Sequence, residues 1–376
     1  MSTPMIPIAS HAIASLVPAG LILAGATVGG AWGWAILGYM TVYVWVLDRM
    51  NVTLKPREDL ERVARVYSVL LALVHFAVMP AAVWALAAGA FNWPQALAFW
   101  AGTGLFLGQV SNSNAHELIH RPGRAERGLG VLVYVTLLYA QHVPAHLLVH
   151  HVHVATDRDP NSAALGHGFW SFALRAWLGE LRAGYLAEAR RRPGLRHPYL
   201  RYTLGEVGVV MMAAALAGWA GVAALLALAG YAQIQLLLAD YIQHYGLRRK
   251  ARADGRTEPT GPAHSWNAPH WYSAAMMLNA PRHSDHHTNP GRIYSALRLE
   301  ADMPRWPYSM PVMATIALIP PLWRRVMDRR VRRVMEGLGG GRPDLSHSSH
   351  AEPRHDSVAA VGPAGVGGRA DVGGSL

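Results

Sequence analysis

The 376-residue sequence contains no cysteine. Disulfides, iron–sulfur clusters and four-cysteine iron centres are therefore excluded within this chain, and any redox chemistry needs electrons from elsewhere. Charged residues are also scarce, at 15% of the chain, and residues 1–47 contain no Asp, Glu, Lys or Arg. Hydrophobic residues make up 52%. Long uncharged runs of this kind predict membrane spans, because a helix needs about 20 apolar residues to cross the hydrocarbon core.

The apolar runs predict an all-α integral membrane protein with six transmembrane helices in three hairpins. The predicted spans are about 12–30, 31–48, 68–89, 94–112, 205–220 and 222–243. No basic segment and no cleavage site accompany the first run, so we expect a retained span and not a secretory signal. A further run at 129–143 is short and holds His142 and Pro144. We expect it to form a helix at the membrane interface or buried against the bundle.

The loops predict an orientation. The turns inside the hairpins are uncharged, whereas the segments after the second, fourth and sixth spans are basic. Their basic residues are Arg49, Lys55, Arg57, Arg62, Arg65, Arg121, Arg124, Arg127, Arg248, Arg249 and Lys250. By the positive-inside rule these segments and both termini face the cytoplasm. The net charge of +11 lies in these clusters, which fits anionic lipid better than nucleic acid. Residues 1–337 then form the membrane domain, and the Gly-, Ser- and His-rich residues 338–376 are expected to be disordered.

Nine of the 20 histidines gather in four segments at or beyond the predicted cytoplasmic helix ends. The segments read "NAHELIHR", "HLLVHHVHVATDRDPNSA", "DYIQHYG" and "RHSDHH". The nine are His116, His120, His146, His150, His151, His244, His283, His286 and His287. Spacings of i, i+4 place His116 with His120, and His146 with His150, on one helix face each. The nine rings can therefore meet in one chamber under the bundle.

The number of imidazoles indicates a metal centre. Imidazole is a common ligand for iron, zinc and copper. One ion takes four to six ligands, so nine rings suit two ions. A tetrahedral structural zinc would leave most of them idle, whereas redox-active iron needs open positions where oxygen binds. We therefore predict a cytoplasmic, histidine-rich diiron cap.

Several acids near these histidines have two possible roles. Glu117, Asp240 and Asp285 could accept the outer N–H of ligating rings, or could be solvated or ion-paired carboxylates. Asp157 and Asp159 are expected to shape a turn before Pro160.

The other histidines are predicted to be structural. Caps or packing residues are expected at His11, His75, His142, His197, His264 and His270. The remaining three, His347, His350 and His355, are expected to belong to a solvated, low-complexity tail. His153 and His167 lie close to the cluster of His146, His150 and His151 but off its helical spacing, and stay unassigned.

Two other functions compete with an iron oxygenase. "HELIH" matches H-E-x-x-H, in which two histidines bind zinc and the glutamate is the general base of a protease. "TNPG" (288–291) loosely resembles a downstream motif of intramembrane proteases. A protease has no use for the six or seven further histidines, however. A membrane metal transporter would place histidines within its spans, and here they lie past the helix ends.

Taken in order, the four segments resemble those of the alkane 1-monooxygenases, the membrane-bound non-haem diiron alkane hydroxylases of the fatty acid desaturase/hydroxylase superfamily. The resemblance covers roughly residues 30–330. "HELIHR" is similar to the first box, and the second segment to the second box with its "VAT…DP…SA" continuation. "DYIQHYG" and "RHSDHH", the latter followed by "NP" and "Y", are similar to the remaining two. Fatty-acyl desaturases also bind their metals through histidine boxes, but they lack the "HYG" and "VAT…DP" motifs.

This resemblance implies that the nine histidines bind two irons. It also implies that dioxygen supplies one atom to a terminal methyl group of a medium- or long-chain n-alkane, while the other becomes water. Rubredoxin and its reductase would deliver the electrons, at a bacterial inner membrane. A fatty-acyl desaturase or hydroxylase and a xylene-type aryl-methyl monooxygenase stay open as alternatives. The chain departs from the family's usual residues at Gln243, Asp240, Ala145 and His167, which leaves the ligands intact but opens the question of their supporting contacts and of the substrate range.

Overall fold

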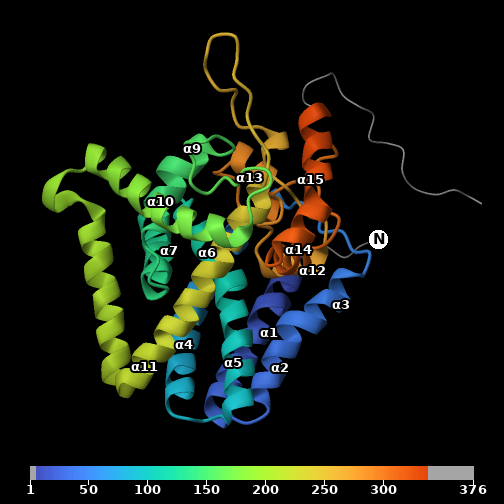
Figure 1. Ribbon diagram of the computed structural model, residues 1–376. Coiled ribbons are helices and arrows are strands. Elements are labelled where there is room, and N and C mark those ends of the chain that lie inside the picture. Colours follow the sequence, from blue (N-terminus) through green and yellow to red (C-terminus); the bar gives the residue numbers. More distant parts are fainter. Residues whose placement is uncertain (1–5, 338–376) are drawn as a thin grey trace, which may run out of the picture. The chain divides into compact units, whose positions relative to one another are not determined.

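The computed structural model describes residues 6–337 (Figure 1). The tail predicted to be disordered, with His347, His350 and His355, lies outside the described residues. Within them the chain is helical, and its β-structure is limited to two isolated bridges, Ala251 with Thr257 and Asn267 with Arg305. The all-α prediction is therefore confirmed for the described part.

The helices vary greatly in length. The first half of the chain contains α1 (Ile6–Val28), α2 (Trp32–Gly38), α3 (Val44–Asp48), α4 (Glu61–Ala87), α5 (Trp93–Phe106), α6 (Asn112–Ile119) and α7 (Arg124–Thr136). The second half contains α8 (His142–Ala145), α9 (His151–His153), α10 (Phe169–Arg191), α11 (Pro198–His244), α12 (Trp271–Met276), α13 (His283–Thr288), α14 (Met310–Ala317) and α15 (Pro320–Gly337). Three π turns are η1 (Tyr39–Tyr43), η3 (Leu107–Ser111) and η4 (His146–His150). Four 3₁₀ turns are η2 (Glu58–Leu60), η5 (Gly194–Arg196), η6 (Pro262–His264) and η7 (Tyr294–Ala296).

Three helical stretches are long and apolar enough to cross a membrane: Ile8–Val28, Glu58–Ala87 and Pro198–His244. Two other predicted spans fall on helices that a π turn interrupts, α2–η1–α3 and α5–η3–α6. The last stretch contains two predicted spans, because Ala217 and Gly218 leave the helical conformation inside α11. Gly218 has φ 59° and ψ −151°, a region open essentially only to glycine. In Figure 1 the two halves of α11 form a V. The crossing of all six stays a prediction.

The helices α1, α2, α4 and α5 run side by side, and α10 lies across their upper end in Figure 1. The contact between α2 and α5 is close because it uses glycines. A Cβ on Gly33 would stand 2.5 Å from the Gln95 carbonyl oxygen, and one on Gly102 would stand 2.8 Å from the Leu37 nitrogen. Small residues at such positions allow helix backbones to approach in a membrane.

The helix α7 confirms the prediction for the short apolar run at 129–143. It packs against α4, α6 and α11, and its Val133 and Tyr134 are fully buried. The helix α10 was not predicted. Its 23 residues alternate leucines and tryptophans with arginines, so that no apolar run marks it in the sequence. It packs on α8, η4 and α11 and so brings residues 169–191 to the histidine segments.

Candidate metal centre

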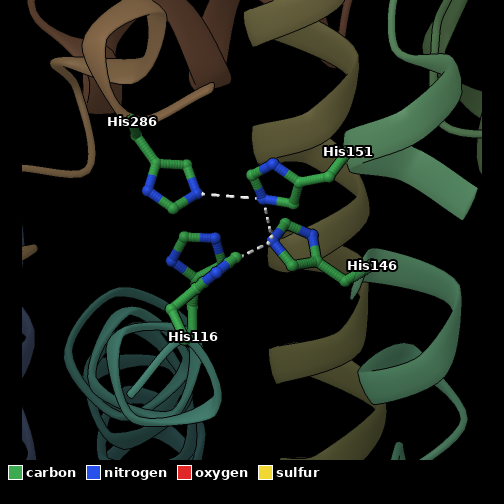
Figure 2. Close-up of side chains that lie close together, drawn as sticks. His116, His146, His151 and His286 are labelled. Atoms are coloured by element: carbon green, nitrogen blue, oxygen red, sulfur yellow. Dashed lines mark hydrogen bonds between the residues drawn. The ribbon is translucent and has the colours of Figure 1, made fainter. Parts of the chain in front are cut away.

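The structure brings all nine predicted histidines together, in two adjacent groups. Group one contains His116, His120, His146, His151 and His286; group two contains His150, His244, His283 and His287. Within each group, the nitrogens available as ligands lie within 4.8 Å of one another. Figure 2 shows rings of group one, from α6, from η4 with α9 and from α13, pointing toward one centre. His153 and His167 lie outside both groups.

Local helix geometry assigns the α6 and α13 histidines to their groups. His116 and His120 are one α-helical turn apart and join the same group, as their i, i+4 spacing predicts. His283 and His287 are likewise one turn apart and join group two. His286 follows His283 by three residues but serves group one. The short helix α13 therefore lies between the groups and contributes to both.

The second histidine segment differs from its prediction. The i, i+4 spacing predicts that His146 and His150 share a face, but His146 joins His151 in group one and His150 belongs to group two. The cause is the π turn η4, in which the His151 N–H donates to the His146 carbonyl, five residues earlier. This bond places residue i+5, and not i+4, over residue i. The π turn thus divides three histidines of one segment between the groups.

The spacing of the ring nitrogens fits a shared ion. In group one, the His146 Nε2 lies 3.0 Å from the His120 Nε2 and 2.9 Å from the His151 Nε2, which lies 3.2 Å from the His286 Nε2. In group two, the His283 Nε2 lies 3.0 Å from the Nε2 atoms of His244 and His287. Two nitrogens at about 2.1 Å from one ion are about 3.0 Å apart at a 90° angle and about 3.4 Å apart at the tetrahedral angle. The observed distances are close to these values, so the rings of each group are spaced as ligands that share one ion would be.

Burial keeps most of these rings neutral, as metal binding requires. It lowers the pKa of His116 to about 3. It also holds the pKa well below the usual value in His120, His146, His151, His283, His286 and His287. His150 differs. Burial is the largest single influence and lowers its pKa, but the carboxylates of Asp159, Asp240 and Glu180 together outweigh burial, so the net shift of the pKa is upward.

Asp159 orients His150. Its Oδ2 accepts a hydrogen bond from the His150 Nδ1 at 2.9 Å, and the buried Nε2 of this ring has no hydrogen-bond partner. The Nε2 is thus available to an ion, and a carboxylate fixes the tautomer. Asp159 also makes the predicted turn, because its Oδ1 accepts from the Asn161 N–H at 3.1 Å. The sequence analysis did not predict the contact of Asp159 with His150. The contact forms because the turn folds the chain back onto this histidine, nine residues earlier.

The three acids predicted to support the rings contact other groups. Glu117 lies 3.3 Å from Arg121 and accepts from the Tyr294 N–H. Asp285 accepts from Arg292 at 2.5 Å, from Asn289 and from the Arg298 N–H. Asp240 accepts from Asn161 at 2.6 Å. Among the described residues, the hydrogen bonds of these acids thus go to side chains and backbone outside the two groups, which favours the ion-paired or packed alternative. The engagement of Glu117 with Arg121 also argues against a protease, whose glutamate must face the metal-bound water.

Four of the six histidines predicted to be structural have structural partners. His75 bonds Ser111 and Thr136, and His11 bonds the Ala275 carbonyl. His197 accepts from the Tyr199 N–H as the N-cap of α11, and His264 lies 3.1 Å from Glu258. His270 is the N-cap position of α12.

His142 was predicted to be a cap or packing residue, but it also contacts a buried acid and a ring of group one. Its Nδ1 lies 3.2 Å from the Glu180 carboxylate, and its ring centre lies 5.1 Å from that of His146. It also lines the cavity beside group one. The sequence gives little sign of this, because Glu180 comes from the unpredicted helix α10.

A largely apolar cavity of about 550 Å³ leads from the histidines into the helical bundle. His116, His146 and His283 form part of its lining. Its apolar walls come from η1 and α3, from α5 and η3, from α11 and from α14. They include Met40, Val44, Leu105, Ile234, Leu238, Met310 and Val312. The π turns η1 and η3 both contribute to the walls. A hydrophobic molecule can therefore reach the histidine groups from among the apolar helices.

Comparisons with known proteins agree with this site. The Fatty acid desaturase family model matches residues 90–315, which include all nine histidines. The chain is 34% identical to Alkane 1-monooxygenase 1 of Pseudomonas aeruginosa over 285 residues, 72% of this chain and 74% of the relative. It is 30% identical to an Alkane 1-monooxygenase of Pseudomonas putida, over 80% of this chain and 79% of the relative. A xylene/toluene monooxygenase hydroxylase component of Pseudomonas putida is 27% identical over 56% of this chain and 57% of the relative. The chain therefore belongs to the fatty acid desaturase family and, within it, to the alkane 1-monooxygenases.

Proposed function

We propose that this protein hydroxylates the terminal methyl group of medium- or long-chain n-alkanes to primary alcohols, using dioxygen at a centre of two iron ions. The observation that carries the proposal is the arrangement of the nine histidines. They form two groups with ligand-like nitrogen spacing beside an apolar cavity. This arrangement joins a metal centre to a binding space that suits an unfunctionalised chain.

The nine histidines would hold the irons, five at one ion and four at the other. Each ion would need a position that no ring occupies, where oxygen could bind. The irons, when bound, supply the activation of dioxygen. The chain's own residues orient the rings, exclude water and direct the substrate. Asp159 orients the His150 ring, and the imidazoles whose pKa burial lowers need not lose a proton to bind iron.

The cavity would hold the alkane with one methyl group at the histidines. Its volume of about 550 Å³ lies in the usual range for small-molecule sites, about 300–1,000 Å³. An alkane has no polar group and so needs no hydrogen-bond partner in the cavity. The apolar walls would also exclude water that would compete for the metal. The relatives named alkane 1-monooxygenases support this substrate over an aryl-methyl compound, because they match a larger share of the chain than the xylene/toluene relative.

The protein would span a bacterial inner membrane six times, with both termini and the metal centre on the cytoplasmic side. The basic loops support this orientation. The helix α10 would lie in the membrane interface. Trp170, Leu174, Leu178 and Tyr185 are exposed along one face, and Arg175 is exposed beside it. An apolar stripe flanked by arginines is typical of a helix at the headgroup level.

Electrons would come from rubredoxin and its reductase. The described site consists of histidines, and the whole sequence lacks the cysteines that an internal iron–sulfur centre needs. We expect purified protein with alkane and oxygen to form alcohol only after a rubredoxin system is added. Turnover with NADH alone would contradict this electron supply.

Metal and product analysis test the function directly. We expect about two irons per chain in purified protein and a primary alcohol from n-alkane. Replacing His150 or His286 with Ala, one from each group, should lower bound iron and abolish hydroxylation. The matched control is His197→Ala, which removes a buried imidazole outside the groups. One zinc per chain, or unchanged iron and activity in both variants, would refute the proposal; a double bond or an aryl-methyl product would assign the alternative substrates.

A further inference from the structure

Three buried carboxylates meet at one amide beside the histidines. Asp159, Glu180 and Asp240 are 3%, 0% and 6% exposed. The Asn161 Nδ2 donates to the Glu180 Oε2 at 3.0 Å and to the Asp240 Oδ2 at 2.6 Å. The Asn161 backbone N–H donates to the Asp159 Oδ1. We name these three carboxylates with Asn161 the acid cluster.

The acid cluster reaches both histidine groups. Asp159 accepts from the His150 Nδ1 at 2.9 Å, and the Nε2 of this ring is buried and has no partner. Glu180 lies 3.2 Å from the His142 Nδ1. The His142 ring lies against His146 of group one, with 5.1 Å between ring centres. The acid cluster therefore contacts group two directly, through His150, and is separated from group one by a single imidazole, His142.

The acid cluster has no lysine or arginine as a partner among the described residues, and its basic contacts are the imidazoles of His142 and His150. The ion pairs of residues 6–337 connect none of the three carboxylates to a lysine or an arginine. Two other buried acids near the histidines differ in this respect, because Glu117 pairs with Arg121 and Asp285 pairs with Arg292. Buried carboxylates without a positive partner are strongly unfavourable. Protonation of His150 would compensate one of the three charges and leave two.

We propose that the acid cluster is the counter-charge of the metal centre. This inference rests on the proposed function. Two divalent ions bound only by neutral imidazoles carry four positive charges, and no ligand offsets them. The acid cluster offers up to three negative charges close to both ions without occupying a coordination position. It therefore stabilises the metal-loaded protein and favours the more oxidised state of the irons.

The arrangement is a property of this chain's own residues. Asp240 lies in the last turns of α11 and is buried. Glu180 comes from α10, and Asn161 from the turn after the second histidine segment. Asn161 donates to both carboxylates and so reduces the repulsion between them. Its Oδ1 is buried without a partner, because the amide turns its N–H groups toward the acids.

Two substitutions that preserve shape, Glu180→Gln and Asp240→Asn, remove one charge each. The matched control is Glu188→Gln. Glu188 lies on the same helix and is 3% exposed, but Arg192 pairs with it at 2.6 Å. The zinc affinity of metal-free protein is measured by competition with a chelator, and the midpoint potential is measured on iron-loaded protein. We expect zinc binding about 10- to 100-fold weaker in both variants, as for other outer-contact losses, and a more positive potential. Glu188→Gln should leave both unchanged.

Thermal unfolding separates counter-charge from a purely structural role. Without metal, Glu180→Gln should unfold at the wild-type temperature or above, because repulsion inside the acid cluster is relieved. With metal it should unfold at a lower temperature than wild type. A structural role would lower both temperatures. Glu180→Asp, which keeps the charge, should recover part of the lost zinc affinity.

The outcomes also separate this inference from the proposed function. If wild-type protein binds two metal ions and the variants match its affinity and potential, the counter-charge is refuted and the metal centre stands. Lower stability of Glu180→Gln in both states would equally refute it. If wild-type protein binds no metal at the histidines, the proposed function itself is refuted.

Discussion

The π turn η4 makes an unusual prediction about single-residue deletions. Because the His151 N–H bonds the His146 carbonyl across five residues, η4 holds one residue more than an α-helical turn. Deleting Leu148, which is half-buried, would convert this turn to an ordinary one. His146 and His151 would then be spaced i, i+4, the spacing by which His116 and His120 already share group one. We therefore expect the deletion to leave group one assembled.

The same deletion in a regular helix should have the opposite result. Removing Leu118 from α6 changes the spacing of His116 and His120 from four residues to three. One residue corresponds to 100° of rotation and 1.5 Å of rise. At about 5.5 Å from the helix axis, that rotation moves a ring by about 8 Å. The nitrogens of group one lie within 4.8 Å of one another, so His120 would leave the group.

The assay is iron per chain after anaerobic loading, with helix content by circular dichroism as the check on folding. We expect the Leu148 deletion to retain most of the wild-type iron and the Leu118 deletion to lose at least the iron of group one. Equal loss in two folded variants would refute the explanation of how η4 distributes its histidines. Equal retention would show that the α6 pair is not needed for iron binding.

Two further predictions test the membrane placement and the cavity. Since the chain has no cysteine, Leu174→Cys on α10 accepts a single fluorescent label; lipid-soluble quenchers should reach it and aqueous quenchers should not, whereas Arg332→Cys on α15 should show the reverse. Aqueous quenching at position 174 would remove α10 from the interface. Ala239→Phe, which narrows the cavity wall, should leave iron content unchanged and lower turnover of a long alkane by about 100-fold through misplacement of the methyl group. Unchanged turnover would show that the alkane binds elsewhere.

Helical spacing and composition were enough to select the nine histidines that the structure brings together. Nine histidines at or beyond helix ends, in a chain with few charged residues, are the obvious candidates for metal ligands. The structure brings all nine together. Their division between the groups was not predictable, because it depends on a π turn. A π turn has no sequence signal of its own in "HLLVHH", where the i, i+4 rule pairs His146 with the wrong partner.

The contacts around the centre show a second reason for missed predictions. An acid near a histidine in sequence is not its partner when an arginine lies closer, as Arg121 does for Glu117 and Arg292 for Asp285. The acids that do contact imidazoles lie elsewhere in the sequence. Asp159, in a turn, contacts His150, and Glu180, on a helix without a continuous apolar run, contacts His142. Only the tertiary fold places these two beside the rings.

Asp240 shows how such a contact can be built from buried acids. Its carboxylate is buried, and a buried charge alone would destabilise the protein. Here Asn161 donates to that carboxylate at 2.6 Å and to Glu180 at 3.0 Å, so both acids share one amide. The amide satisfies their hydrogen bonds but not their charge. The remaining charge is the reason for our proposal that metal ions in the two histidine groups, which the acids approach through His150 and His142, balance it.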